Sequence, residues 1–523
     1  MKTQQVAPAR VAGACLLAST GGLLHGLCFP PWAVWGLALA APAVVVWAAR
    51  ARGPGCAAAS GWLAGTVAAS LAVTPWMMAA TLDYFRQGPL GALVFASLVG
   101  QVFHALPMVA FALGVWRFAA HARAAVRILA TAGLWILLEL LRSRLGTGAP
   151  WDLLGHAFFA QPLWIQVADL GGVPLLSGLC VVVAAALAEL PSAPRVATLI
   201  GVLTLVAWLG YGAMRLAAER DDAEPLRVAL VQGAVPNAWR ADPARAPDAL
   251  AAFASATRET LASRPALVVW PENAVSFLLE PNEALRGAAA ALLRPSGALL
   301  LTGGPRFAQL EPGRVAFFNS AFLLDGEGAV RATYDKRRLV PFAEYAPLPR
   351  VPALGWRFDA PGDYTPGTHP TVFPAPAPFG VLICFEAIYP DLARDLVRGG
   401  AEFLVNISND AWFGTSAGLE QHFAITVFRA VEFRRALARA TNTGVTAVIG
   451  PSGRQLAAFP REQRGAWTVA VPRRQDETVY ARFGDGPLAL LAMSAVVAGL
   501  LGGVPARRAR YRGGRGDACP RVC

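Results

Sequence analysis

Lysine is almost absent from this sequence, although positive charge is not. Lysine and arginine together number 46, yet only Lys2 and Lys336 are lysines. A compact ammonium group fits where a planar guanidinium does not, and it exchanges its proton more easily. Lys336 is therefore a candidate functional residue, against the alternative that it is a chance exception in a biased composition.

Charged side chains are also scarce, at 15% of the residues, compared with roughly 25% in an average soluble domain. The apolar excess lies in residues 11–216 and 487–504, whereas 225–475 has the composition of a soluble domain. This distribution indicates a membrane protein that carries a globular insert. Arginines at the ends of apolar runs explain the net charge of +12 through membrane topology, so nucleic acid is not an expected partner.

Paired cysteines are missing as well. The seven cysteines form no CxxC pair and no Cys/His cluster, which argues against a zinc site and a disulfide framework. Cys384 is the only cysteine of the insert. We expect no metal and no cofactor.

Eight apolar runs approach the ~20 residues that a helix needs to cross the hydrocarbon core. The predicted spans are 11–28, 32–49, 57–78, 90–116, 127–142, 170–189, 196–216 and 487–504. The interrupted apolar segment 147–164 is predicted to be re-entrant or interfacial. The predicted domains are a membrane domain with seven helices (1–219), a globular domain (220–480), and an eighth helix with a basic tail (481–523).

Arginine placement predicts the orientation of these spans. Every second loop is rich in basic residues, namely Lys2, Arg10, Arg50, Arg52, Arg117, Arg123, Arg127, Arg195 and the tail 507–521. The alternate short loops hold fewer: Arg86, Arg142 and Arg144. Because cytoplasmic loops are enriched in Lys and Arg, both termini are predicted to be cytoplasmic and the insert to lie on the outer face. The first apolar run lacks a convincing cleavage site and is predicted to be an uncleaved anchor.

The insert alternates strand-like and helix-like segments. Strands are predicted at 226–233, 266–272, 298–305, 317–325, 379–386, 402–410 and 445–453, and helices at about 246–263, 281–293, 391–399 and 420–437. Several of the strands are apolar on both faces, which indicates a buried sheet covered by helices. The predicted class is therefore a layered α/β domain.

Three short stretches place a reactive side chain at the end of a predicted strand. They are VVWPENAV with Glu272, YDKRRLVPFAEYAP with Lys336 and Glu344, and LICFEAIYP with Cys384. Ligand sites in α/β sheets gather outside the carboxyl ends of the strands, so these residues can converge. A thiol is a strong nucleophile once deprotonated, a nearby carboxylate can take its proton, and an ammonium can stabilise an oxyanion. The prediction is Glu272 as base, Lys336 as oxyanion partner and Cys384 as nucleophile.

Each of these residues also has a structural interpretation. An isolated strand cysteine is most often a buried packing residue, and Glu272 can cap the helix that ENAVSFLL suggests. Glu344 and Glu386 can be structural ion-pair partners. The conjunction of one cysteine, one lysine and a Trp-Pro-Glu strand end in a single domain favours a Cys-Glu-Lys site.

These motifs carry a family resemblance. The insert resembles the nitrilase superfamily of carbon–nitrogen hydrolases, whose Glu, Lys and Cys motifs match WPE, DKRRLVPF and LICFE. The whole chain resembles the apolipoprotein N-acyltransferase family of the bacterial inner membrane, through VPFAEYAP, ISNDAWFG and QHFAITVFRAVEFRRALARATNTGVTAVIGPSG. The resemblance implies an αββα sandwich that faces the periplasm and is joined to a multi-pass, eight-helix membrane domain.

The resemblance also implies a function. Cys384 would take an acyl chain from a phospholipid, with phosphatidylethanolamine as the expected donor, and hold it as a thioester. The α-amino group of a diacylglyceryl-cysteine at the N-terminus of an apolipoprotein would then accept the chain. Glu344 would assist the site and Glu386 would support it. Two alternatives remain: a membrane-tethered amide hydrolase with the same three residues, and an inactive membrane scaffold or transporter.

Five aromatic residues are weaker candidates for contact with substrate or lipid. Phe385 stands where family members often have tyrosine, so its predicted role is packing. Trp239 matches a functional tryptophan of the family only after a small shift along the chain. Trp412 and Phe413 in NDAWFGTS are candidates for a lid or lipid-contacting loop, because aromatic residues suit a membrane interface. Trp151 in GAPWDLL can contribute from the membrane side.

Overall fold

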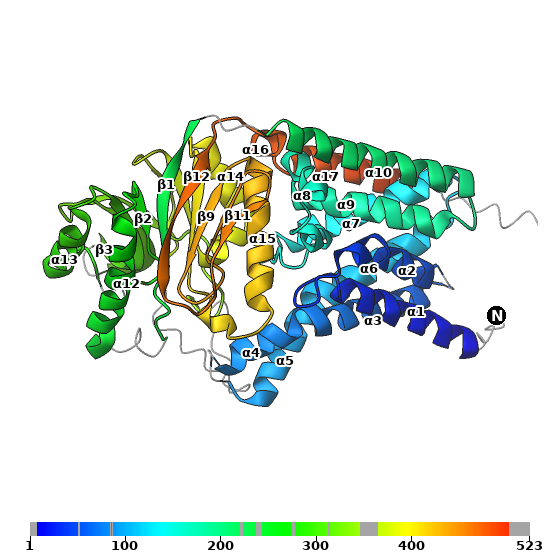
Figure 1. The fold of residues 1–523 in the computed structure, drawn as a ribbon. Coiled ribbons are helices and arrows are strands. Elements are labelled where there is room, and N and C mark those ends of the chain that lie inside the picture. Colours follow the sequence, from blue (N-terminus) through cyan, green and yellow to red (C-terminus); the bar gives the residue numbers. More distant parts are fainter. Residues whose placement is uncertain are drawn as a thin grey trace, which may run out of the picture.

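The chain forms a helical part and a two-sheet part that lie side by side (Figure 1). The computed structural model describes residues 8–50, 53–83, 85, 87–219, 223–236, 243–274, 278–311, 314–345 and 364–501. All of its strands fall between Ala223 and Arg473. Most helices of the other part precede them, and the last helix follows them and returns to the helical part.

Among the residues that the structure describes, the helical part contains ten main helices. They are α1 (Pro8–Gly26), α2 (Ala41–Ala49), α3 (Pro54–Ala72), α4 (Thr74–Asp83), α5 (Pro89–Gly100), α6 (Leu106–Phe118), α7 (Ala124–Arg142), α9 (Ala168–Glu189), α10 (Pro194–Ala217) and α17 (Gly486–Leu501). A π-helical turn, η2 (Gln101–Ala105), joins α5 to α6. Proline occupies the first turn of most of them, where its missing N–H costs nothing.

Five helical segments among the described residues are long and apolar enough to cross a membrane. They are Pro54–Ala72, Pro89–Phe118, Ala124–Arg142, Ala168–Glu189 and Pro194–Ala217. Two other predicted spans form shorter apolar helices, Trp35–Ala49 and Gly486–Leu501. Helix α1 covers the first predicted span, and the predicted span 57–78 is divided between α3 and α4.

Small residues let these helices pack closely. A side chain at Gly22 would collide with the backbone of Ala64 on α3, and one at Gly133 on α7 would collide with the backbone of Ala492 on α17. Close backbone approach at small residues is the usual packing device of membrane helices. The contact at Gly133 fixes the C-terminal helix against α7.

Most of the segment 147–164 is buried against the helical part. It includes the short helix η3 (Leu154–Phe158) and ends within α8 (Pro162–Ile165). Helix α9 begins with a kink, because Gly171 and Gly172 leave helical geometry and Gly172 has a φ of +68°.

The two-sheet part contains two six-stranded mixed sheets. The first has the order β12-β1-β2-β3-β4-β5 and the second β11-β10-β9-β8-β7-β6. The strands of the first are β1 (Ala223–Gln232), β2 (Leu267–Val269), β3 (Leu299–Glu311), β4 (Arg314–Leu324), β5 (Val330–Asp335) and β12 (Gly465–Arg473). Those of the second are β6 (Val372–Phe373), β7 (Phe379–Ile383), β8 (Phe403–Ser408), β9 (Leu437–Thr441), β10 (Ala447–Ile449) and β11 (Gln455–Ala458).

The sheets pack face to face between two helical layers. Along β7, Val381 and Ile383 point into the core between the sheets, whereas Leu382 points to the outer side, as the two-residue period of a strand requires. Helices α12 (Ala246–Leu261) and α13 (Glu283–Leu293) cover the first sheet. Helices α14 (Pro390–Arg398) and α15 (Gly418–Phe433) cover the second.

Helix α15 lies between the second sheet and the helical part (Figure 1). The side-chain amide of Gln421 donates to the backbone oxygens of Pro30 and Ala72 at 2.8 and 2.9 Å. Arg434, just beyond α15, forms an ion pair with Asp169 of α9 at 2.7 Å. These buried contacts fix the two-sheet part on the end of the helical bundle.

One predicted helix is too long. The prediction 420–437 runs past the end of α15, which stops at Phe433 because Arg434 adopts a left-handed conformation with a φ of +49°. Strand β9 then begins at Leu437 and lies in the middle of the second sheet. The Ala- and Arg-rich sequence favours helix locally, but burial in the sheet overrides that preference.

Candidate active site

The three reactive stretches meet in one cavity of about 130 Å³. Its lining includes Glu272, Asn319, Lys336, Glu344 and Cys384. The first four come from the first sheet and the loops that follow its strands, and Cys384 comes from the second. The cavity therefore lies where the ends of the two sheets meet.

Cys384 follows β7 directly and begins the short 3-10 helix η6 (Cys384–Ile388). Its φ of +52° is unusual for a residue with a side chain, and it is only 3% exposed. Burial raises the pKa of its thiol far above the ordinary value, and the carboxylate of Glu272 raises it further, against the opposing effect of Lys336. The thiol is therefore protonated at rest, and a base must take its proton when it reacts.

Glu272 is buried beside the thiol and held at both oxygens. Its Oε1 accepts hydrogen bonds from the side-chain amide of Asn319 at 2.8 Å and from Lys336 Nζ at 3.3 Å. Its Oε2 accepts one from the backbone N–H of Asn409 at 2.9 Å. These contacts orient the carboxylate of Glu272 in the cavity that also holds Cys384.

Lys336 is 1% exposed and lies between two carboxylates. Its Nζ donates to Glu344 Oε1 at 2.9 Å as well as to Glu272. Burial lowers the pKa of Lys336, but Glu344, Glu272 and Cys384 together raise it well above the ordinary value. The ammonium group therefore stays charged and is available to an oxyanion in the cavity.

Glu344 also lines the cavity, where its side chain contacts Lys336 and Asn319. Its Oε1 accepts from Lys336 and from Asn319, and its Oε2 accepts from the backbone N–H of Val340 at 2.7 Å. The side-chain amide of Asn319 thus bridges Glu272 and Glu344 at 2.8 Å each. These contacts hold the carboxylate of Glu344 against the ammonium group of Lys336.

Glu386 is not among the residues that line the cavity. Its carboxylate connects the loop that follows Lys336 with the turn that begins at Cys384. Its Oε1 accepts from Tyr334 Oη and from the backbone N–H groups of Arg337 and Arg338, at 2.9, 2.6 and 3.1 Å. Its Oε2 accepts from the backbone N–H of Ile383 at 2.8 Å. The structure therefore places it as a support between Lys336 and Cys384.

A second buried ionic cluster, which we call the arginine cluster, lies on the other side of Cys384. It consists of Asn406, Ser408, Asp410, His422 and Arg439. Arg439 forms an ion pair with Asp410 at 2.6 Å and donates to Asn406, whose side-chain amide donates to the carbonyl oxygen of Leu382 at 2.8 Å. Ser408 donates to Asp410 at 2.7 Å, and His422 Nδ1 lies 3.1 Å from the same carboxylate. Burial raises the pKa of Asp410, but Arg439 and His422 outweigh it and lower the pKa below its ordinary value, so the carboxylate is ionised.

The sequence interpretation missed Asn319 and the arginine cluster. A signal existed for both: Asn319 interrupts the apolar strand FFNSAFLLD, and Arg439 lies in the apolar segment ALARAT. A polar residue in a buried strand needs a partner, but the sequence does not say which one.

The aromatic candidates have different positions. Trp412 lines the cavity, whereas Phe413 is buried against Trp76 of α4 and Trp151. Phe385 is partly buried and meets the ring of Tyr389 edge-on. Trp239 lies outside the described residues.

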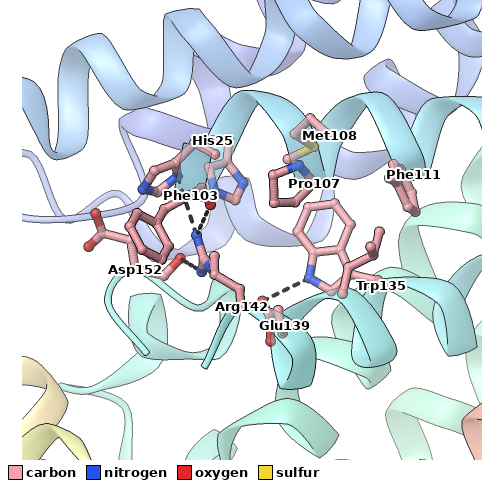
Figure 2. Close-up of a pocket in the computed structure, with 11 residues that line it drawn as sticks. His25, Phe103, Pro107, Met108, Phe111, Trp135, Glu139, Arg142 and Asp152 are labelled. Atoms are coloured by element: carbon pink, nitrogen blue, oxygen red, sulfur yellow. Dashed lines mark hydrogen bonds between the residues drawn. The ribbon is translucent and has the colours of Figure 1, made fainter. Parts of the chain in front are cut away.

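The loop that carries Trp151 is fixed from the helical part. Arg142, at the end of α7, donates to the backbone oxygens of Asp152 and Phe103 at 3.1 Å each (Figure 2). Trp151 itself donates to Gln421 at 2.8 Å. This buried arginine therefore holds in place the membrane-side wall against which Phe413 packs.

A metal centre has no basis in the described residues. Within the ranges given above, no group of three or more His, Cys, Asp or Glu side chains is arranged to hold a metal ion. The chemistry that the cavity offers is that of a thiol, a carboxylate and an ammonium group.

Comparisons with known proteins cover both parts of the chain. The family model for carbon-nitrogen hydrolases matches residues 227–480, and the model for the N-terminal domain of apolipoprotein N-acyltransferase matches residues 21–186. The apolipoprotein N-acyltransferase of Geobacter metallireducens is 32% identical over 499 residues, which cover 93% of this chain and 94% of that protein. The one from Azotobacter vinelandii is 35% identical over 517 residues, covering 96% and 97%. Among solved structures, an amidase from Nesterenkonia sp. aligns with 51% of this chain and 95% of its own, at 22% identity and a TM-score of 0.38.

Proposed function

The chain belongs to the apolipoprotein N-acyltransferase family, and from this premise we propose how its residues carry out the reaction. The protein is an acyltransferase that N-acylates lipoproteins, and its insert has a nitrilase-like fold. The observation that carries the proposal is the shared cavity in which Cys384 meets Glu272 and Lys336. We propose these three residues as nucleophile, base and oxyanion partner.

In the first half-reaction, Glu272 takes the proton of the Cys384 thiol while the sulfur attacks the ester carbonyl of a phospholipid. The negative charge that develops on the carbonyl oxygen is stabilised by the ammonium group of Lys336. The tetrahedral intermediate then expels the glycerol oxygen, which takes the proton from Glu272. Lysophospholipid leaves, and the acyl chain remains on Cys384 as a thioester.

In the second half-reaction, the α-amino group of the diacylglyceryl-cysteine attacks the thioester carbonyl. Glu272 accepts a proton from the amine, and the sulfur departs and is protonated again. The product is an amide-linked third acyl chain on the lipoprotein. Phosphatidylethanolamine is the proposed donor, and both substrates reach the cavity from the bilayer.

The position of α9 supports a periplasmic active site in the inner membrane. One end of this helix meets the two-sheet part, through the ion pair between Asp169 and Arg434. At the other end, Glu189 pairs with Arg50 and Arg127. Because arginine-rich ends face the cytoplasm, the two-sheet part would face the periplasm.

We further propose eight membrane crossings. The five candidate spans would be joined by α1, by Trp35–Ala49 and by α17, which pack against them. The corresponding domains are 1–219, 220–480 and 481–523.

The amide hydrolase alternative is not favoured. The family relatives span both the helical part and the insert, whereas a hydrolase of small amides needs no membrane part to bring its substrate. Attack by water on the thioester would also release the acyl chain as a fatty acid before a lipoprotein could accept it.

The proposal is tested with purified full-length protein and phosphatidylethanolamine of defined chains. Mass spectrometry is expected to find one acyl chain on Cys384, which hydroxylamine removes and which is absent from Cys384→Ala. Addition of a diacylated lipopeptide should discharge the thioester and yield a triacylated product. Release of ammonia from small amides without any triacylated peptide would overturn the proposal.

A further inference from the structure

A second cavity, of about 540 Å³, opens where the two-sheet part meets the helical part. We call it the interfacial cavity. Its walls come from the end of α7, the kink of α9, the start of α14, and the connection between α16 (Val479–Phe483) and α17. It has no lining residue in common with the cavity that holds Cys384. Its size is that of a small-molecule site.

The mouth of the interfacial cavity carries two ion pairs that are partly exposed. Arg144 pairs with Asp485, and Arg338 pairs with Asp391 at 2.9 Å. The side chains of Arg144 and Asp391 are 59% and 57% exposed, and ion pairs in water are weak. A ligand that offers its own anion and cation can therefore replace these partners at little cost.

The wall of the interfacial cavity offers further donors. Arg429 is buried, and its guanidinium donates to the backbone oxygen of Ile388 and pairs with Glu432 at 2.7 Å. The third nitrogen, Nε, is buried without a hydrogen-bond partner. A buried donor without a partner is costly, and an oxygen-rich anion in the cavity could supply the missing acceptor. Arg394 also lines the cavity and is anchored by the backbone oxygens of Ala481 and Arg482 at 2.7 Å each.

Apolar side chains border the charged mouth. Leu141 and Leu145 flank Arg144, and Phe483 precedes Asp485 by two residues; each of the three is more than half exposed. Helix α7, which ends at Arg142, is one of the candidate membrane spans. Charged groups inside a cavity with apolar groups on the membrane side form the pattern that an amphiphile requires.

We propose that the interfacial cavity binds the head group of a second, unreacted phospholipid that carries both a phosphate and an amine. The phosphate would lie among Arg144, Arg394 and Arg429, because guanidinium groups favour phosphate oxygens. The ammonium group would lie near Asp391 and Asp485. The acyl chains would run along Leu141 and Leu145, at the end of α7 and just beyond it. This site is separate from catalysis and goes beyond the acyl transfer proposed above.

The test uses full-length Cys384→Ala protein in detergent, so that its outcome is independent of acyl transfer. Dihexanoyl phosphatidylethanolamine is the probe, and native mass spectrometry with calorimetry gives stoichiometry and affinity. We expect two bound lipids. The Arg144→Gln/Arg394→Gln double variant should lose one of them, with an affinity at least about tenfold weaker. Arg461→Gln, which removes an exposed arginine paired with Glu420 elsewhere, is the matched control and should retain both.

Three other ligands test which chemical groups of the lipid the interfacial cavity recognises. Glycerophosphoethanolamine, which lacks acyl chains, should bind more weakly than the short-chain lipid, and dihexanoyl phosphatidylglycerol, which lacks the amine, should also bind more weakly. Inorganic phosphate should not compete at equal concentration. The proposal is overturned if the double variant loses no bound lipid and its affinity is unchanged, or if phosphate alone competes equally well. A single bound lipid that the double variant loses would support the interfacial site and count against lipid binding in the cavity that holds Cys384.

A photo-crosslinking lipid keeps the proposal testable if the double variant fails to fold. Phosphatidylethanolamine with a benzophenone on its head group should label peptides that contain residues 143–146 or 483–486 of the Cys384→Ala protein. Labelling that is confined to the catalytic cavity would contradict the proposal.

Discussion

Cys384 lies between two buried ionic clusters that differ in their cation. On one side, Lys336 pairs with Glu272 and Glu344 and faces a cavity. On the other, Arg439 pairs with Asp410, and the side chains of both are 0% exposed. The chain uses arginine nearly everywhere, so the single lysine of the described residues occupies the position where chemistry is proposed.

The difference follows from the two cations. A guanidinium group makes several directed hydrogen bonds and stays charged, which suits the support of a turn. An ammonium group is a compact point charge that can turn from a carboxylate to a developing oxyanion. We call Glu272, Lys336 and Glu344 the lysine cluster. The proposed mechanism therefore assigns the response to the substrate to the lysine cluster and a supporting role to the arginine cluster.

Exchanging the lysine gives the largest expected effect. Lys336→Arg keeps the charge, but a guanidinium group does not fit the buried space between Glu272 and Glu344. We expect acyl-enzyme formation to fall roughly 10²–10³-fold, the loss typical of removing an oxyanion donor. The measurement is the rate of thioester formation by mass spectrometry, with the thermal midpoint of unfolding recorded to exclude a folding defect. Activity within a few-fold of the wild type would show that the choice of cation does not matter here.

The protonation state of Cys384 gives the next prediction. Because burial and Glu272 raise its thiol pKa far above the ordinary value, the thiolate fraction at neutral pH is small and grows only as the pH rises. The rate of alkylation by iodoacetamide should therefore increase about tenfold per pH unit from pH 7 to 9, without a plateau. The experiment uses a variant in which the six other cysteines (Cys15, Cys28, Cys56, Cys180, Cys519 and Cys523) are replaced by alanine, and the same variant with Cys384→Ala is its blank. A plateau near neutral pH would indicate a resting thiolate paired with Lys336.

The reciprocal exchange on the other side of Cys384 should affect stability more than activity. Arg439→Lys keeps the ion pair with Asp410 but loses the hydrogen bond to Asn406, at a cost of about 2 kcal/mol. We expect the thermal midpoint of unfolding to fall by a few degrees and thioester formation to change less than about tenfold. A loss as large as that of Lys336→Arg, with an unchanged midpoint, would place Arg439 in the catalytic machinery instead of its support.

The sequence predicted that the reactive residues converge, because each of the three reactive stretches lies at the carboxyl end of a predicted strand. Glu272, Lys336, Glu344 and Cys384 do line one cavity; their roles in catalysis remain predictions. Convergence was predictable because parallel strands in α/β sheets present their carboxyl ends on one side.

Contacts that depend on strand register were not predictable. Asn319 reaches Glu272 and Glu344 only because β4 pairs antiparallel with β3, which brings Asn319 opposite Pro305. Likewise, Arg439 meets Asp410 because LARAT forms β9 in the centre of a sheet instead of continuing a helix. In both cases the pairing joins distant parts of the chain, and local preferences do not encode it.

The smallest expected effect is that of changing Phe385. Phe385 follows the nucleophile, is partly buried, and packs edge-on against Tyr389 with ring centres 5.3 Å apart. Phe385→Tyr keeps the ring and its contact with Tyr389 and adds one hydroxyl group. A substitution that leaves the existing contacts in place is expected to alter stability by about 0.5 kcal/mol or less. We expect thioester formation and transfer to the lipopeptide to change by no more than about threefold. Phe385→Ala is the contrasting variant, because it removes the ring that supports the nucleophile turn and should reduce both rates. If Phe385→Tyr instead accelerated transfer more than tenfold, the position after the nucleophile would belong with the lysine cluster as a group that acts on the substrate.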